Sequence, residues 1–203
     1  MASARTLGEQ VYAWAYARLG QQVGSGASWE LALCALRSLR LDHARTAADE
    51  SVLGGWGTPV PLAQALPGDI LELQNYELRV TTLHTAHFDD GTRRQRSEQS
   101  SRTFAHHIAI IAAPPNEHSV AVLEQVARSE PCIERRTYLL RDSGPIVTHV
   151  FQHANDEANR LRPAKVIQHT NLRVTGSARA FRPLITATST HKRTPARGYE
   201  SKL

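Results

Sequence analysis

Three polar residues of this chain, Ser28, His107 and Glu124, have the types and settings of a nucleophile, a general base and an orienting carboxylate. Ser28 follows a glycine-rich turn and opens an apolar run, so we expect it on the first turn of a helix, where free backbone N–H groups converge. His107 and Glu124 each lie in a short apolar run that predicts a strand. If the helix begins beside those strands, a hydroxyl attacking a carbonyl carbon has a base and oxyanion donors nearby.

The elements that must position these residues follow from the apolar periodicity. Residues 6–19 predict an amphipathic helix that ends at Gly20, and residues 28–41 predict a central, mostly buried helix. Strands are expected at residues 70–74, 76–83, 107–113, 119–126, 133–140, 146–152 and 165–169. Helices first and antiparallel strands afterwards predict an α+β fold in which the N-terminal helices pack on an antiparallel β-sheet.

Three stretches, in this order along the chain, resemble the CHAP group of papain-like hydrolases, the cysteine- and histidine-dependent amidohydrolases and peptidases. They are VGSGASWELA at residues 23–32, Trp56-Gly57 through PGDIL at residues 67–71, and HHIAII at residues 106–111 with VLEQ at residues 122–125. The resemblance implies a papain-like CHAP fold over residues 1–170. It also implies cleavage of an amide bond, commonly in peptidoglycan peptides or glutathionyl conjugates, without a cofactor or a metal.

The resemblance also assigns roles to single residues. It places the family's nucleophile at Ser28, its general base at His107 and its orienting carboxylate at Glu124, with Gln125 as the fallback orienter if the strand register is shifted by one. The residues expected around the oxyanion site and the cleft are Gly26, Trp29 and Trp56. The family has cysteine where this chain has Ser28, so the expected ligand is a peptide-like or amide molecule that the site binds with or without cleaving it.

The serine leaves several interpretations open. A thiol beside an imidazole and a helix N-terminus ionises readily, whereas a serine hydroxyl loses its proton only in concert with attack. Ser28 therefore indicates a catalytically impaired hydrolase, a native cysteine deliberately exchanged for serine, or a working amide or ester hydrolase with a Ser28-His107-Glu124 triad. The structural alternatives are that Ser28 merely caps its helix and that His107 is a buried, hydrogen-bonded core residue.

Charge is distributed unevenly along the chain. The formal net charge is +5, but residues 171–203 carry seven Lys and Arg against Glu200, or +6, which leaves −1 for residues 1–170. We therefore expect a flexible basic tail at residues 171–203, and an exposed polar hairpin at residues 84–104. A further interpretation is an interaction module whose tail engages an acidic partner; no nucleic-acid motif accompanies the basic residues, so nucleic acid is an unlikely partner.

The remaining sequence signals concern compartment and cofactors. The two cysteines, Cys34 and Cys132, form no disulfide framework, and no apolar run is long enough to span a bilayer, so we expect a soluble, intracellular protein without membrane insertion. The spacing of His84 and His87 suits a metal only on a helix, and this stretch is extended, so no metal site is expected. The final Ser201-Lys202-Leu203 matches the peroxisomal address in a eukaryotic cell, or is a chance match.

Overall fold

The computed structural model describes residues 6–39, 55–126, 130–151 and 165–184. Two helices come first, and antiparallel strands follow, which confirms the predicted α+β class. The elements are α1 (Leu7–Tyr16), α2 (Ser28–Ser38), β1 (Thr58–Val60), the 3-10 turn η1 (Leu62–Gln64), β2 (Ile70–His87), β3 (Arg93–Ile111), β4 (Ser119–Gln125), β5 (Ile133–Leu139), β6 (Ser143–Phe151) and β7 (Lys165–Arg182). No helix within these ranges is long and apolar enough to cross a membrane.

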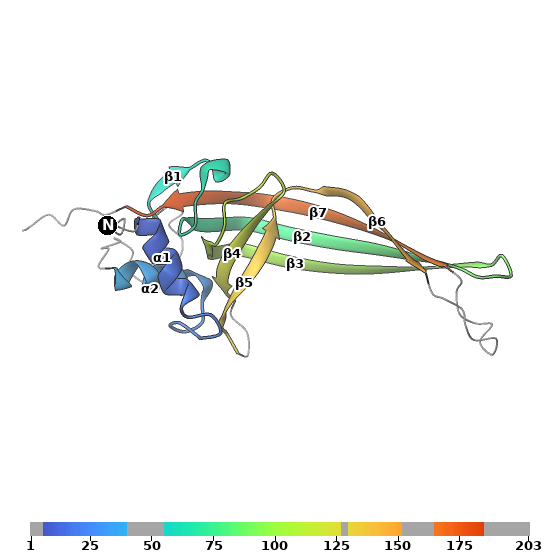
Figure 1. Cartoon of the computed structure of the whole chain (residues 1–203), viewed down its shortest axis with the longest axis horizontal. Helices are drawn as coiled ribbons and strands as arrows, with labels where there is room; N and C mark the ends of the chain where they lie inside the picture. The colour runs from blue at the N-terminus through green and yellow to red at the C-terminus, as the bar shows by residue number, and fades with distance from the viewer. Residues whose placement is uncertain (1–5, 40–54, 127–129, 152–164, 185–203) are drawn as a thin grey trace, which may run out of the picture.

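The strands form one sheet in the order β1-β7-β2-β3-β4-β5, with β6 paired to β7. The helices lie at one end of the molecule, and β2, β3, β7 and β6 extend far beyond them as a narrow arm (Figure 1). The predicted hairpin at residues 84–104 is the distal part of this arm, with β2 paired to β3 as far as His87 and Arg93. The two strands expected at residues 70–83 are a single strand, because pairing with β3 and β7 continues past the irregular residue Asn75.

Side chains of the sheet alternate between two buried clusters, as the two-residue period of a strand requires. The helix-side cluster joins α1 and α2 to Ile70, Ile108, Ile110, Leu123 and Phe181. The opposite cluster holds Leu71, Leu73, Ala109, Ile111, Val122, Tyr76 and Tyr138. Because both faces of the sheet are covered only at the helical end, the core is confined to that end, and residues 93–101 of the arm are exposed.

The boundary expected after residue 170 is wrong for residues 171–182. These residues form most of β7, which pairs with β2 along the arm and the core and with β1 at its end. Phe181 is buried in the helix-side cluster, and the guanidinium of Arg182 donates to both oxygens of the buried Asp69 at 3.2 and 3.0 Å. Strand pairing stabilises this segment although its sequence contains few large apolar residues. Residues 152–164 and 185–203, the latter including Ser201-Lys202-Leu203, lie outside the described residues.

The core and the arm meet at a bend in the sheet. Asn75 has a left-handed backbone, with φ 49°, and the β2–β7 register shifts between Gln74 and Glu77. Opposite the bend, Gly176 has φ +93°, and a Cβ there would lie 2.4 Å from the Asn75 carbonyl oxygen, so only glycine permits this approach. The bend brings Tyr76 and Phe104 onto the same face as Tyr138, where the three rings pack together.

Candidate active site

Ser28 is the first residue of α2, as predicted, but it does not cap the helix. The cap position is Ala27, and no side chain bonds there. The interpretation of Ser28 as a capping residue is therefore wrong. Its hydroxyl is free for other partners, and as a first-turn residue it lies where the backbone N–H groups of Ser28 and Trp29 have no acceptor within the helix.

Gln125 holds the loop that leads into α2. Its Oε1 accepts from the Val23 N–H at 2.7 Å, and its Nε2 donates to the Val23 carbonyl at 2.8 Å and to the Ala27 carbonyl at 3.4 Å. These bonds use the side chain fully, and the bond between His107 and Glu124 makes a second orienter unnecessary. Gln125 thus positions the start of the helix, and its predicted role as fallback orienter is wrong.

Replacing Gln125 with leucine should lower the free energy of unfolding by about 2 kcal/mol, because the buried Val23 N–H loses its partner and the Val23 carbonyl keeps only the Gly26 N–H. Urea denaturation at neutral pH measures this loss. The matched control is Gln22→Leu, which removes an exposed side-chain bond to the Gly24 carbonyl and should cost below about 0.5 kcal/mol. Equal costs for the two variants would contradict the positioning role of Gln125.

Two of the expected cleft residues have structural roles instead. Gly26 has φ +98°, a Cβ there would lie 2.6 Å from the Pro131 side chain, and its N–H donates to the Val23 carbonyl at 3.2 Å. Its N–H therefore closes a turn and is not an oxyanion donor. Trp56 is 1% exposed and packs in the helix-side cluster, so it is a core residue and not a cleft wall. Trp29 alone of the three remains beside Ser28, half-buried at the helix start.

Ser28 lies against the backbone of β3, next to His107. Its Oγ accepts from the Ile108 N–H at 3.4 Å, and that nitrogen belongs to the peptide bond that directly follows His107. The oxygen is therefore within about 6 Å of the His107 Cα. Since the Ile111 N–H donates to Asp69 on the β2 side, alternation directs the Ile108 N–H away from β2, toward the side of β3 where β4 pairs only at Ile110 and Ile111.

His107 and Glu124 form the second half of the site. His107 Nε2 is 2.7 Å from Glu124 Oε2, and the two side chains are 3% and 0% exposed. Tyr138 also donates its hydroxyl to Glu124 Oε2, and Arg136 Nε makes an ion pair with Glu124 Oε1 at 2.6 Å. The predicted pairing of the histidine with the carboxylate is present in the structure, and the carboxylate gains two further partners from β5.

This environment keeps Glu124 ionised. Burial acts to raise its pKa, but the hydrogen bonds from His107 and Tyr138, together with the charges of His107 and Arg136, outweigh burial and leave the pKa lowered. For Tyr138 the same contact works the other way: burial and the negative charge of Glu124 raise its pKa, so the phenol stays protonated as a donor. Phe104 stacks on the His107 ring at 4.4 Å between centroids and restricts its rotation.

Sequence reasoning missed Tyr138, Arg136 and Phe104. The signal for the first two was their alternation on β5, which puts them on one face opposite Val120 and Val122, next to Glu124. That signal can be used only once the β4–β5 register is known. Phe104 reaches His107 because of the bend at Asn75, and no local sequence pattern predicts this bend.

His106 lies on the face of the sheet opposite to His107. By alternation it shares a face with Ile108 and Ile110, on the helix side, whereas the partners of His107 belong to the opposite cluster. Its Nε2 is 2.8 Å from Oε1 of the fully buried Glu72 on β2. Two neighbouring histidines of β3 thus each hold a buried carboxylate, on opposite faces of the sheet.

Comparison with known proteins adds one finding. A family model described as the AIM3/BBC1 cysteine proteinase-fold domain matches residues 1–144, most of the 203-residue chain. The chain belongs to this family. The match confirms the papain-like fold that the sequence predicted, whereas the assignment to the CHAP group rests on the three motifs alone. None of the curated proteins and none of the solved structures in the comparison matches the chain.

In this AIM3/BBC1 cysteine proteinase-fold domain, Ser28 and His107 are adjacent but not joined. Within the residues that the structure describes, no hydrogen bond links Ser28 Oγ to the His107 ring; the hydroxyl oxygen accepts from Ile108, and His107 uses Nε2 for Glu124. The arrangement holds an ionised carboxylate, an oriented imidazole and a helix N-terminus, which are the parts that would stabilise a thiolate at position 28.

Proposed function

We propose that this chain is a papain-fold binding protein for peptide or amide ligands, in which serine at the nucleophile position leaves hydrolysis impaired. The observation that carries the proposal is the bond of Ser28 Oγ to the Ile108 N–H. A serine attacks only when its proton passes to a base, and this hydroxyl oxygen accepts a bond from the backbone while making none to His107. A thiolate needs no such transfer, because it is already charged.

Binding does not depend on the nucleophile. The N–H groups at the start of α2 can still bind a ligand carbonyl, and the buried His107-Glu124 pair still holds β3 beside them. Loss of the reacting group removes stabilisation of the transition state, whereas contacts to the rest of the ligand remain. A protein of this kind retains a ligand instead of releasing a product.

The impaired state predicts no covalent labelling of Ser28. A fluorophosphonate probe should label the wild-type protein no more than the Ser28→Ala variant, because no base takes the hydroxyl proton. In-gel fluorescence after one hour at pH 8 measures this, with an active serine hydrolase as the positive control. Labelling of wild type that Ser28→Ala abolishes would contradict impairment and would support the alternative, an active amide or ester hydrolase with the Ser28-His107-Glu124 triad, which the retained His107-Glu124 bond favours.

Binding is tested with a short neutral probe, acetyl-trialanine amide at millimolar concentration. Its amide groups should shift the backbone NMR signals of Ser28, Trp29 and Ile108, and the Ser28→Trp variant, which fills the site, should remove these shifts. The matched control is Ser38→Trp at the other, exposed end of α2, which should leave them unchanged. Absence of shifts in the wild type would contradict a ligand site at the helix start.

A further inference from the structure

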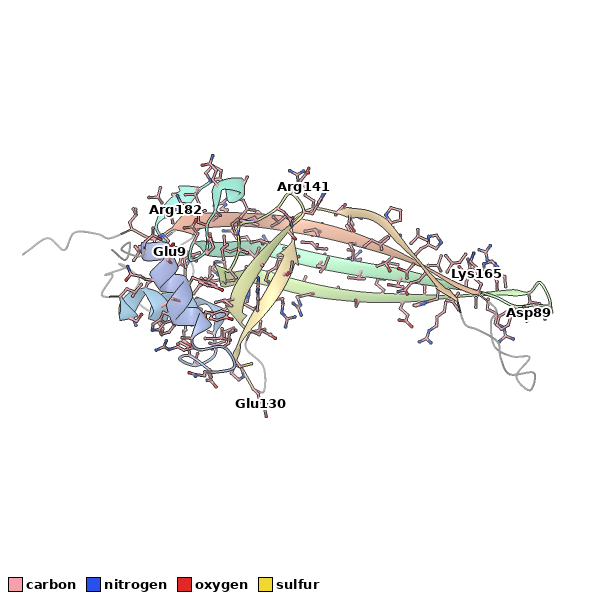
Figure 2. All side chains as sticks on the ribbon, in the orientation of Figure 1. Glu9, Asp89, Glu130, Arg141, Lys165 and Arg182 are labelled. Carbon is pink, nitrogen blue, oxygen red and sulfur yellow. The ribbon has the colours of Figure 1, made fainter. Side chains whose placement is uncertain are left out.

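β3 presents an open backbone edge that is unusually long. It pairs with β2 from Arg93 to Ile110, but on its other side β4 pairs only with Ile110 and Ile111. Over residues 93–106, which we call the β3 edge, no other strand of the described part of the chain pairs with that side, and the residues that follow, 107–109, are buried. Figure 2 shows side chains projecting on both sides of the narrow arm, and residues 93–101 of β3 are exposed. An open edge is a template for a further strand.

The positive charge of the β3 edge indicates which kind of molecule can bind to it. Arg93, Arg94, Arg96 and Arg102 stand on β3 against Glu98 alone, a net charge of +3 for residues 93–103. A second copy of the chain would place arginine near arginine, which is unfavourable across a strand pair. Residues 93–103 also contain no aromatic side chain on which nucleotide bases could stack. The complementary occupant is an acidic polypeptide.

The β3 edge leads to the candidate site. Ser28 Oγ occupies the Ile108 N–H, which points to the same open side, so a strand laid along the edge ends at Ser28. From Arg102 to Ile108 the distance along an extended chain is roughly 20 Å, the length of about six residues. One bound segment can therefore contact the arginines with its acidic residues and reach the start of α2 with its end.

We propose that the β3 edge binds an acidic, extended peptide segment as an additional strand, and that the end of this segment enters the site at Ser28. The proposal rests on the proposed function and names its ligand class. Main-chain hydrogen bonds supply affinity, and the arginines supply the preference for Glu and Asp at alternate positions.

The first experiment measures the contribution of the edge arginines. The probe is a fluorescein-labelled peptide of about 16 residues alternating Glu and Val, long enough to span from Arg94 to Ile108, and its binding is followed by anisotropy at 50 mM salt. Charge reversal on the edge, Arg94→Glu with Arg96→Glu, should weaken binding at least tenfold. The matched control reverses the cross-strand pair Arg79 and Arg173 on the inner strands of the arm, and should change the affinity less than threefold. Equal losses in the two double variants would overturn the proposal in favour of general attraction by a positive surface.

The second experiment tests strand addition itself. The same peptide, N-methylated at alternate residues, keeps its charge but loses half of its main-chain donors, and should bind at least tenfold more weakly. Hydrogen exchange of residues 93–108 should slow when the unmodified peptide binds, while β5, an edge strand at the other end of the sheet, should not change. Equal binding of both peptides, a dimer of the free protein in sedimentation, or tighter binding of an oligothymidylate than of the peptide would overturn the proposal.

The outcomes for this proposal and for the proposed function are separable. If the neutral tripeptide perturbs Ser28 while the acidic peptide leaves the β3 edge unprotected, the site stands and the edge proposal fails. If the acidic peptide binds the edge and neither probe perturbs Ser28, the edge binds a partner and the proposed function at Ser28 fails.

Discussion

The Ser28→Cys variant should carry a thiol that iodoacetamide alkylates at pH 6 roughly 100-fold faster than Cys34. A thiol of ordinary pKa near 8.5 is almost entirely protonated at that pH, whereas the start of α2, the Ile108 N–H and a hydrogen bond from the His107 ring would all stabilise a thiolate at position 28. Cys34 is an internal reference of opposite character, since burial, and then the charge of Glu30, raise its pKa despite Arg37. Mass spectrometry of the alkylated peptides separates the two rates.

The neighbouring histidines provide a matched control for this result. In the Ser28→Cys background, His107→Gln should return the alkylation rate at pH 6 to within a few-fold of that of Cys34. His106→Gln should leave the rate high, because the N–H that binds position 28 directly follows His107, while the His106 ring is held by Glu72 of β2. A position-28 thiol no more reactive than Cys34 would mean that the cysteine proteinase-fold site is not retained. Equal effects of the two histidine variants would mean that a general disturbance of β3, and not the loss of the His107-Glu124 pair, changes the alkylation rate of the thiol.

The residues that sequence reasoning found are those whose chemistry is local. Ser28 was placed at a helix start by the glycine turn and the apolar run that flank it, and His107 and Glu124 by the alternation of their own strands. Their meeting required only that the helix pack beside consecutive strands. Each of these inferences depends on residues close in sequence, where side-chain period and turn chemistry determine the backbone.

The errors lie where distant segments decide the outcome. The C-terminal part of β7 is polar and small, and it is a strand because β2 offers it a partner some 100 residues earlier in the chain. Trp56 follows two glycines, and an aromatic residue in such a loop has the same local pattern whether it lines a cleft or fills the core. Gln125 and Glu124 are adjacent and both buried, and only the loop at Val23 shows which of them holds the histidine.

The open side of β3 links these observations to binding. A papain-like site needs its nucleophile at a strand edge that a ligand can reach, and here the divergence of β4 after Ile110 provides that access. The same divergence leaves the arm without a cover on that side. The arm and the candidate site therefore lie along one strand, and a ligand bound to the β3 edge as we propose would gain a defined register at Ser28.

Replacing Glu124 with glutamine should lower the free energy of unfolding at pH 7 by about 3 to 5 kcal/mol. The carboxylate is fully buried among His107, Tyr138 and Arg136. A neutral amide removes the buried charge that pairs with Arg136, which then keeps only Glu134 as a counter-ion, and presents N–H groups to donors. Urea denaturation measures the loss. Glu117→Gln is the control. Both side chains of the Glu117-Arg141 ion pair are exposed, so its loss should lower the free energy of unfolding by less than about 1 kcal/mol.

The cost of Glu124→Gln should depend on pH in one direction. Because the folded-state pKa of Glu124 is lowered, its charge stabilises the fold fully above the unfolded value of about 4.3, and this stabilisation is lost as the pH falls through the lower, folded-state pKa. The difference in unfolding free energy between wild type and Glu124→Gln should therefore be constant from pH 7 to pH 5 and shrink below pH 4. A difference that stays constant down to pH 2.5 would mean that packing, and not the ionised carboxylate, holds His107 in place.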